Sequence, residues 1–270
     1  MKHQSKSEAP AIDYSALRVN IDPRKLASVA TFRATNDIRH CLGGVLIEKA
    51  PQGGVYLVAS NGHTIAIVYA PDGLLEGFDS VILRTSRELL AACKKSWKFN
   101  PRLMVNGARL FMADGNFGFD AEATDREFFV QPGPSVIEGK FPDWARVMPD
   151  FPKLTQTIRH PVASKYLARV EQALSVHHSK ASFAATRLWQ EPDSGVVAIQ
   201  CDPDPYLLIL VMPLRTSDRE GADLFNSLIN GPFGEAKRRK TAELANELTK
   251  VANPNQRDAA NHSNPAEAAA

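Results

Sequence analysis

Two adjacent histidines, His177 and His178, lie between Ser175 and Ser179, and these residue types could act in nucleophilic catalysis. A histidine beside a serine can act as general base for a nucleophilic hydroxyl. No Asp or Glu stands close by in the sequence to orient either imidazole. We therefore interpret the pair as exposed residues between a helix and a strand, and we expect no catalytic residues and no enzyme activity.

Three aspartates, Asp193, Asp202 and Asp204, could in principle ligate a metal ion. Pro203 and Pro205 interrupt them, and no glycine stands at the position that a calcium loop requires. These residue types are typical of turns. We expect neither a metal nor a cofactor.

The chain has 270 residues, 44% of them apolar, and a formal net charge of +2. This composition supports a large core and gives no overall basic signature of a nucleic-acid-binding protein. Its three cysteines are widely spaced and form no CxxC motif, so we expect reduced, buried thiols at Cys41, Cys93 and Cys201. Met1–Pro10 has no apolar signal core and Tyr206–Met212 is too short to span a bilayer, which favours a cytoplasmic protein without membrane contact.

The stretch Leu42–Ala70 predicts three short strands at residues 45–48, 55–59 and 64–69. The first turn is Pro51–Gly54 and the second is Ser60–His63. The second turn contains Asn61-Gly62, a pair that tolerates positive φ and is typical of tight hairpins.

A strand, a helix and three further strands recur three times along the chain, each time over roughly 60 residues, which indicates stacked modules or a symmetric arc. Asp22-Pro23 and Ser86 are typical helix starts. In the first repeat the strand is expected at 17–21, the helix at 22–30 and the three strands within 45–69. In the second they are expected at 80–83, 86–97 and 102–121. In the third they are expected at 157–160, 164–176 and 181–212. The remaining segments are expected to be a linker at Phe128–Pro149, a helix at Glu235–Val251 and a disordered end.

Four segments of this sequence resemble the bacterial β sliding clamp, the processivity factor of the replicative DNA polymerase. Asp37–Leu46, Val58–Ala66 and Glu138–Pro149 are similar to its middle domain, and Val211–Arg215 to its C-terminal end. The resemblance implies an α+β DNA clamp fold of repeated β-α-β-β-β half-domains, with helices inside and curved antiparallel sheets outside.

The resemblance covers residues 17–215 and implies four segments. These are a flexible arm at 1–16, a clamp domain at 17–150 like the family's middle domain, a half domain at 151–215 like the end of its last domain, and a C-terminal extension at 216–270. The family's first domain has no counterpart. The family's Asp-Gly-His-Arg motif is Asn-Gly-His-Thr here, which removes one basic residue at Thr64.

The resemblance also implies a pocket for the peptides of polymerases and other partners. An apolar wall with a flexible methionine suits an extended peptide that ends in Leu-Phe. The matching positions are Leu42, Ser60, Gly62, His63, Thr64, Ile65, Leu210, Val211, Met212, Pro213, Leu214 and Arg215. The alternative is that 210–214 is only an edge strand of the core, although Pro213 blocks continued pairing.

The helices of the repeats carry basic residues opposite their apolar stripes, and the equivalent helices of the family face DNA. Contacts of this kind would be independent of sequence and sensitive to salt. The matching helix positions are Arg24, Lys25, Arg33, Arg87, Lys94, Lys95, Lys165 and Arg169. Asn36 and His40 match a loop that approaches DNA in the family. The alternative interpretation is an ordinary solvated helix face.

The C-terminal extension contains Gly221–Phe225, which resembles the pentapeptide by which polymerases dock into β clamps. We hypothesise that Ala222, Asp223, Leu224 and Phe225 dock into the pocket of the same chain or of a neighbour. The alternative is that Leu224 and Phe225, with Leu228 and Ile229, form the apolar face of a packing helix.

The sequence therefore predicts a clamp-like tethering factor. Its expected partners are double-stranded DNA, a polymerase or repair protein with a clamp-binding peptide, and a clamp loader. The unpaired half domain predicts a homo-oligomer, because it leaves sheet edges exposed. The alternative function is a clamp mimic that does not encircle DNA and instead sequesters clamp-binding partners or modulates the host clamp.

Overall fold

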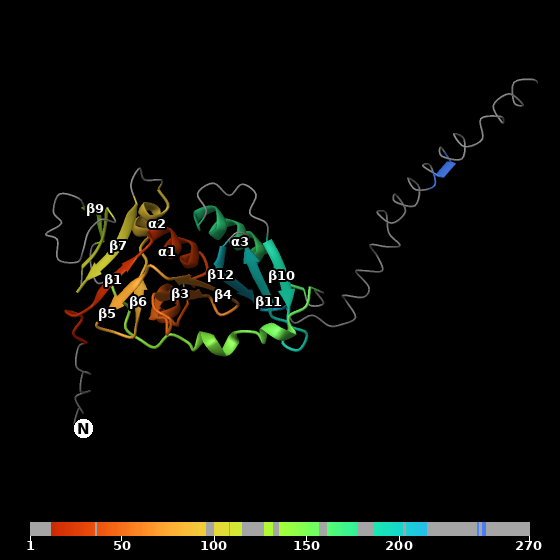
Figure 1. Cartoon of the computed structure of the whole chain (residues 1–270), viewed down its shortest axis with the longest axis horizontal. Coiled ribbons are helices and arrows are strands. Elements are labelled where there is room, and N and C mark those ends of the chain that lie inside the picture. The colour runs from red at the N-terminus through yellow and green to blue at the C-terminus, as the bar shows by residue number, and fades with distance from the viewer. Residues whose placement is uncertain are drawn as a thin grey trace, which may run out of the picture. The chain divides into compact units, whose positions relative to one another are not determined.

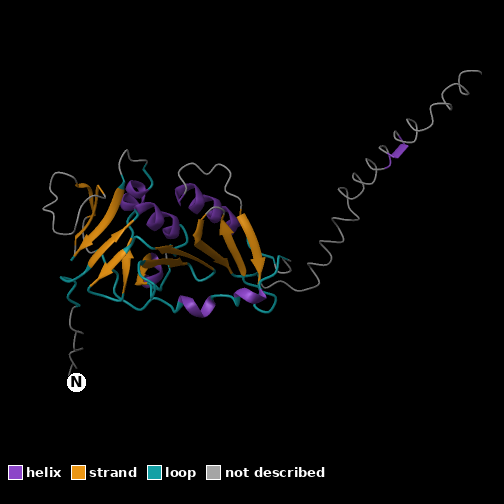
Figure 2. Cartoon of the chain, viewed as in Figure 1, coloured by secondary structure: helices purple, strands orange, loops and turns teal. Residues whose placement is uncertain are grey.

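The computed structural model divides the chain into two compact units, Met1–Leu214 and Arg215–Ala270. It describes residues 12–35, 37–95, 100–107, 109–114, 127–131, 135–156, 161–177, 186–201 and 204–214 of the first unit, and residues 242, 245 and 246 of the second. In these ranges no helix has the length and hydropathy that crossing a bilayer requires. The first unit contains every described strand (Figure 2).

Three repeats build the first unit, as the sequence predicts (Figure 1). The first consists of β1 (Arg18–Ile21), α1 (Pro23–Ala30), β2 (Gly44–Lys49), β3 (Val55–Ser60) and β4 (Thr64–Ala70). The second consists of β6 (Ser80–Arg84), α2 (Arg87–Cys93), β7 (Pro101–Asn106), β8 (Arg109–Asp114) and β9 (Glu127–Gln131). The described part of the third consists of α3 (Ser164–His177), β10 (Thr186–Gln190), β11 (Val197–Cys201) and β12 (Asp204–Val211).

The first two repeats exchange their first strands. One sheet has the order β5–β1–β7–β8–β9, where β5 (Leu74–Glu76) is a short strand that the sequence did not predict. In it β1 of the first repeat pairs antiparallel with β7 of the second. In the other sheet β6 of the second repeat pairs antiparallel with β2 of the first. Each sheet is therefore complete only when both repeats are present.

The third repeat joins the first through their last strands. β12 pairs antiparallel with β4, from Leu207 opposite Val68 to Val211 opposite Thr64. The pairing makes one sheet of seven strands, in the order β10–β11–β12–β4–β3–β2–β6.

The three helices lie in a row on one side of the sheets, with α1 between α2 and α3 (Figure 1). The predicted helix starts are confirmed. The Asp22 carboxylate accepts a hydrogen bond from the Arg24 N–H, with proline in the first turn, and the Ser86 hydroxyl accepts one from the Leu89 N–H. Both caps satisfy N–H groups that have no partner within the helix.

Successive side chains of a strand point to opposite faces of a sheet, so the seven-stranded sheet contributes to two cores. Ile47 and Ile209 on the inner face pack with the helices in the larger core. Leu46, Ile65 and Leu210 belong to a second cluster on the outer face. This cluster also contains Phe141 from the segment that follows the second repeat.

Residues 135–155 form a strap that runs along the outer face from one edge of the sheet to the other. At the β6 edge, Arg84 N–H donates to the Ser135 carbonyl over 2.8 Å and Ile137 N–H donates to the Ile82 carbonyl over 2.8 Å. At the β10 edge, Thr155 and Gln190 exchange two backbone hydrogen bonds of 3.0 and 2.8 Å. The strap therefore covers the second cluster and fastens the third repeat to the first two.

Several sequence predictions need correction or fall outside the described residues. The linker was expected to begin at Phe128, but Glu127–Gln131 is strand β9, because it pairs with the apolar strand β8. Helix α2 ends at Cys93, before the expected Trp97. In the arm expected at 1–16, Tyr14 packs on Phe78 with ring centroids 5.4 Å apart. The strands expected at 117–121 and 157–160 lie outside the described residues.

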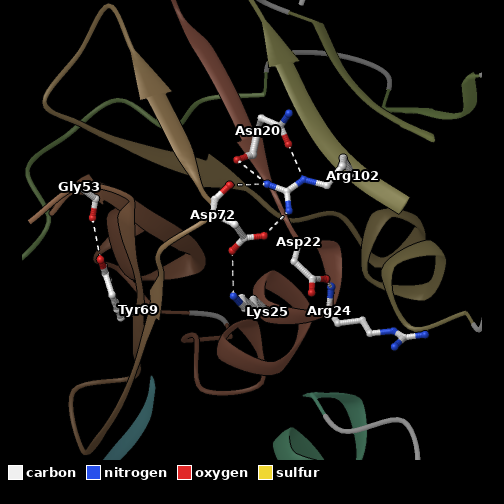
Figure 3. Close-up of polar contacts among 8 residues, drawn as sticks. All are labelled: Asn20, Asp22, Arg24, Lys25, Gly53, Tyr69, Asp72 and Arg102. Atoms are coloured by element: carbon white, nitrogen blue, oxygen red, sulfur yellow. Dashed lines mark hydrogen bonds and ion pairs between the residues drawn. The ribbon is translucent and has the colours of Figure 1, made fainter. Parts of the chain in front are cut away.

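A buried arginine ties the two sheets and α1 together (Figure 3). Arg102 on β7 donates to the Asn20 side-chain oxygen over 2.6 Å, and it also bonds the carboxylate and the backbone carbonyl of Asp72. Lys25 on α1 reaches the same carboxylate at 3.1 Å. Burial opposes ionisation of Asp72, but the hydrogen bonds from Arg102 and Lys25 outweigh it and lower the pKa of Asp72. The ion pair therefore stabilises the fold at neutral pH.

The substitution Asp72→Asn should lower the free energy of unfolding by roughly 1 kcal/mol at pH 7, because it removes the charged partner of Arg102 and Lys25, although solvent screens the half-exposed carboxylate. The folded pKa lies below the unfolded value of about 4. The contribution is therefore present above that value and is lost as the pH falls through the folded pKa. Urea unfolding of the wild type and Asp72→Asn at pH 7 and in acid measures this difference, which should shrink in acid.

The control is Asp79→Asn, which removes a carboxylate from the exposed ion pair with Lys49. Exposed pairs contribute little, so Asp79→Asn should leave the free energy of unfolding unchanged. Equal effects of the two substitutions, or an effect of Asp72→Asn that does not depend on pH, would contradict the interpretation.

Candidate peptide-binding site and basic helix face

A small apolar hollow lies where the turn between β3 and β4, the end of β12 and the strap meet. Its volume is about 140 Å³. Ligand pockets for whole small molecules measure about 300–1,000 Å³, so this hollow has the size for one or two apolar side chains. Its apolar wall consists of Leu42, Ile65, Phe141, Pro142, Val147 and Met212. Polar groups of Ser60, His63 and Asp143 lie among the lining residues.

The turn between β3 and β4 is held in one shape by its own side chains. The Asn61 side-chain oxygen accepts hydrogen bonds from the backbone N–H groups of His63 and Thr64, each over 2.9 Å, and from the Thr64 hydroxyl. The Ser60 hydroxyl donates to the Thr64 carbonyl over 2.9 Å and accepts from the Gly62 N–H. Gly62 has φ +84°, which favours glycine. One wall of the hollow is thus formed before any ligand binds, which lowers the entropy cost of binding.

Two interactions anchor this turn to the third repeat. The Met212 N–H donates to the His63 carbonyl over 2.9 Å. The His63 ring stacks on the Tyr166 ring of α3, with centroids 6.1 Å apart. The hollow therefore forms only when the first and third repeats are joined.

An arginine lines the hollow at a position that the sequence did not predict. The Arg39 guanidinium lies so close to Gly62 that a Cβ there would come within 2.8 Å of Nη2. Asp37 holds this guanidinium through hydrogen bonds of 3.0 Å from Nε and 2.8 Å from Nη2. The same bonds lower the pKa of Asp37 to about 2, so the pair is charged at neutral pH. A guanidinium is therefore present although Thr64 replaces the arginine of the family's motif.

The structure brings seven of the twelve predicted partner-site residues to this hollow: Leu42, Ser60, Gly62, His63, Thr64, Ile65 and Met212. Leu210 is buried beneath the strap and Val211 faces the larger core, so neither lines it. Pro213 and Leu214 follow β12 without lining it, and Arg215 lies outside the described residues. The role of the seven in binding a peptide stays a prediction.

Most of the lining residues that the sequence analysis missed come from the strap. Phe141, Pro142, Asp143, Trp144 and Val147 reach the hollow because the strap folds back over the outer face of the sheet. The Trp144 indole N–H donates to Glu48 over 2.9 Å, and this bond fixes the strap at that point. The sequence does mark residues 138–149 as one of the segments that resemble the clamp family. It does not show that this segment folds back over the sheet and reaches the hollow.

The row of helices presents exposed basic residues mainly at its two ends. Arg87 on α2, Lys94 and Lys95 just after it and Lys165 on α3 are exposed. Helix α1 in the middle is largely buried, from Leu26 to Ala30. Fewer residues of α1 are therefore available to contact a ligand than the amphipathic pattern of its sequence indicates.

Other predicted DNA-facing residues have different surroundings. Lys25 forms an ion pair with Asp72 and only 18% of its side chain is exposed. Its role in facing DNA stays a prediction. Arg33 donates to the Ala30 carbonyl, and burial lowers the pKa of its guanidinium. Arg169 on α3 has a buried Nη1 with no hydrogen-bond partner among the described residues. Arg24 is half-buried, and its guanidinium points away from the Arg102 network (Figure 3).

His40 is exposed and begins a short 3-10 helix, whereas Asn36 lies outside the described residues. His177 Nδ1 lies 3.2 Å from the Ser28 hydroxyl and connects α3 to α1. His178 falls outside the described residues, as does the segment resembling a clamp-binding peptide.

The predicted burial of the cysteines is correct for Cys93, where burial raises the pKa of the thiol to about 12. It is wrong for Cys41, which is only half-buried. The surroundings of Cys201 lie outside the described residues. Within the described ranges, no group of histidine, cysteine and acidic side chains could hold a metal ion.

Comparison with known proteins places this architecture in a class. No family model and no curated protein sequence matches the chain. Solved structures do match. The DNA polymerase sliding clamp from Pseudomonas aeruginosa, determined with a ligand, is 14% identical with a TM-score of 0.52, over 78% of this chain and 69% of the clamp.

DNA polymerase III subunit beta from Borrelia burgdorferi, in complex with a natural product, is 13% identical with a TM-score of 0.53, over 78% of this chain and 65% of that one. The same subunit from Pseudomonas aeruginosa is 16% identical with a TM-score of 0.50, over 77% and 70%. The chain therefore has a divergent α+β DNA clamp fold, and the resemblance seen in its sequence is confirmed at the level of the fold.

Proposed function

We propose that this protein is a non-catalytic, clamp-like tethering factor. It binds duplex DNA without sequence preference through the helix face, and it recruits a polymerase or repair protein that docks a peptide into the hollow. The observation that carries the proposal is the preorganised hollow at the β3–β4 turn, in a chain whose fold is that of DNA polymerase sliding clamps.

The shape and chemistry of the hollow favour an extended peptide with apolar anchors. A volume of about 140 Å³ holds side chains and not a folded partner. Met212 can adjust its rotamer to the incoming residue, and the Arg39 guanidinium can donate to peptide carbonyls or carboxylates. A sequence such as Gln-Leu-Asp-Leu-Phe supplies two apolar anchors and one carboxylate.

Fluorescence anisotropy of a labelled Gln-Leu-Asp-Leu-Phe peptide with the full chain tests this site. The wild type should bind with micromolar affinity, and Met212→Asp should weaken binding at least about tenfold, because a charge would be desolvated against an apolar anchor. Met212 is only partly buried, so this substitution should be tolerated by the fold.

The matched control is Leu74→Asp, which places the same charge on β5 in the other sheet, where the side chain is already exposed. This variant should bind the peptide like the wild type. If the wild type fails to bind, or if both variants bind equally well, the recruiting role is wrong.

The C-terminal extension gives a second element of the proposal. We propose that residues Ala222–Phe225 compete for the hollow, in the same chain or in a neighbour. Replacing Leu224 and Phe225 with alanine in the full chain should then tighten peptide binding several-fold in the same titration, whereas alanine at Leu228 and Ile229 should not. Unchanged affinity of the first double variant would exclude the tail as a competitor.

Nucleic-acid binding depends on the exposed cations at the ends of the helix row. Replacing Lys94, Lys95 and Lys165 with glutamate should weaken binding to a random duplex by about tenfold or more. The slope of log K against log salt should fall by about 0.9 for each phosphate that the protein no longer neutralises. Filter binding over a salt series measures both quantities.

The control triple variant changes Lys140, Arg146 and Lys153 to glutamate, which alters the net charge equally. These residues are exposed on the strap, across the sheet from the helices. The control should keep the larger share of the wild-type affinity. A wild type that binds the peptide but not DNA would contradict tethering and support the alternative of a clamp mimic.

A further inference from the structure

A second and larger groove lies on the outer face of the seven-stranded sheet, where the strap leaves β6 (Figure 1). Its volume is about 650 Å³, against about 140 Å³ for the hollow. Its lining residues come from the segment before β1, from residues 78–82, from β2 and from residues 136–145 of the strap. A groove of this size lies within the range of ligand pockets, about 300–1,000 Å³.

The lining of the groove is largely apolar and aromatic. Ile82 is buried in the second cluster. The rings of Tyr14 and Phe78 lie against each other, with centroids 5.4 Å apart, and the Trp144 ring also lines the groove. Ile12 beside them is 52% exposed, so a ligand could still cover part of its apolar surface.

The charges around the groove are mostly negative. Among the described residues that line it, four carry a carboxylate and one, Lys140, carries an ammonium group. The chain as a whole has a formal net charge of +2, so the groove has the opposite sign. The carboxylates are those of Glu48, Asp79, Glu138 and Asp143.

Three of these carboxylates are held in place by contacts that leave room for a ligand. Glu48 accepts the Trp144 indole N–H over 2.9 Å, and Asp143 accepts a backbone N–H of the strap over 3.2 Å. Asp79 lies 3.4 Å from the Lys49 ammonium, yet its side chain is fully exposed. An ionised carboxylate can accept about four hydrogen bonds, so each retains capacity for a donor.

The charge of the fourth carboxylate, Glu138, acts on the aromatic side of the groove. Burial and the charge of Glu138 both raise the pKa of Tyr14. A carboxylate that opposes a second negative charge favours a positive charge at the same place, by the same Coulomb interaction. The electrostatics of the groove therefore complement a cationic ligand.

The backbone of β6 offers hydrogen bonds to an extended ligand. Asp79 faces β2, because its carbonyl accepts the Lys49 N–H, and Ile82 faces away from β2, because its carbonyl accepts the Ile137 N–H of the strap. Alternation directs the N–H and C=O of Ser80 to the same side as those of Ile82. Ser80 lines the groove, and no other described residue bonds these two groups. A peptide backbone could pair with them.

We propose that this groove binds an extended segment of a partner protein in which basic residues alternate with apolar ones. Its apolar side chains cover Ile12 and the neighbouring rings, its basic side chains meet the carboxylates, and its backbone pairs with Ser80. The aromatic faces add cation–π contacts. The proposal does not rest on the proposed function. The hollow contains the Arg39 guanidinium, so the two sites select peptides of opposite charge.

Fluorescence anisotropy of a labelled Lys-Leu-Arg-Phe-Lys peptide with the full chain tests this inference. The wild type should bind with a micromolar dissociation constant that rises with salt concentration. The charge-reversed peptide Glu-Leu-Asp-Phe-Glu should bind at least about tenfold more weakly. Both titrations contain excess unlabelled Gln-Leu-Asp-Leu-Phe, so that a peptide in the hollow is not counted.

Two variants assign the binding to the groove. Glu138→Lys should weaken binding of the basic peptide at least about tenfold, and Ile12→Ser several-fold through the lost apolar contact. Both residues are exposed, and circular dichroism checks that the variants are folded. The matched controls are Glu171→Lys on α3 and Leu74→Ser on β5, both at exposed positions outside the groove, and they should bind like the wild type.

A wild type that fails to bind the basic peptide would overturn the inference, as would equal binding by the groove variants and their controls. Equal affinity for the charge-reversed peptide would also overturn it. If arginine amide alone binds as tightly as the pentapeptide, the groove takes a small cation and no protein segment. A chain that binds the basic peptide but not Gln-Leu-Asp-Leu-Phe would contradict the recruiting role alone.

Discussion

The pairing of β4 with β12 is the constraint on which the rest of the molecule depends. Five residue pairs, from Leu207 opposite Val68 to Val211 opposite Thr64, turn the strands of two separate repeats into one sheet. Residues on one face of this ladder enter the helix core, and Leu210 and Ile65 on the other face enter the cluster beneath the strap. Without this ladder the His63 carbonyl would lose its hydrogen bond from the Met212 N–H, and the end of β12 would no longer line the hollow.

The strap adds a second constraint, because it holds the outer face of that sheet from edge to edge. Its two ends are bonded to β6 and β10, and Trp144 fixes it to Glu48 between them. Five lining residues of the hollow come from the strap, so the segment that stabilises the sheet also shapes the site. The second cluster would face solvent if the strap were displaced, which explains why a segment with so little regular structure is held at so many points.

The sequence predicts the local parts of this structure better than the parts that depend on distant contacts. The caps at Asp22 and Ser86 and the turn at Asn61 were predicted correctly, because each follows from a few neighbouring residues. The exchange of β1 and β6 was not predicted, since hydrophobic periodicity indicates a strand but not its partner. The ion pair of Lys25 was not predicted either, because its sequence neighbourhood does not reveal Asp72, 47 residues away.

The candidate site shows the same limit. Residues of the β3–β4 turn were identified by a contiguous motif, whereas Arg39 and the strap residues reach the hollow only through the fold. The motif at the turn has threonine at Thr64 in place of a basic residue, which by itself predicts a hollow without a positive charge. The Arg39 guanidinium nevertheless lies beside Gly62, and the motif alone does not show this.

The exchange of first strands makes the first two repeats dependent on each other. β1 of the first repeat pairs with β7 of the second, and β6 of the second pairs with β2 of the first. Removal of either module of roughly 60 residues would leave the other with a vacant strand position, whatever the identity of its side chains. These two modules are therefore expected to be gained or lost as a pair.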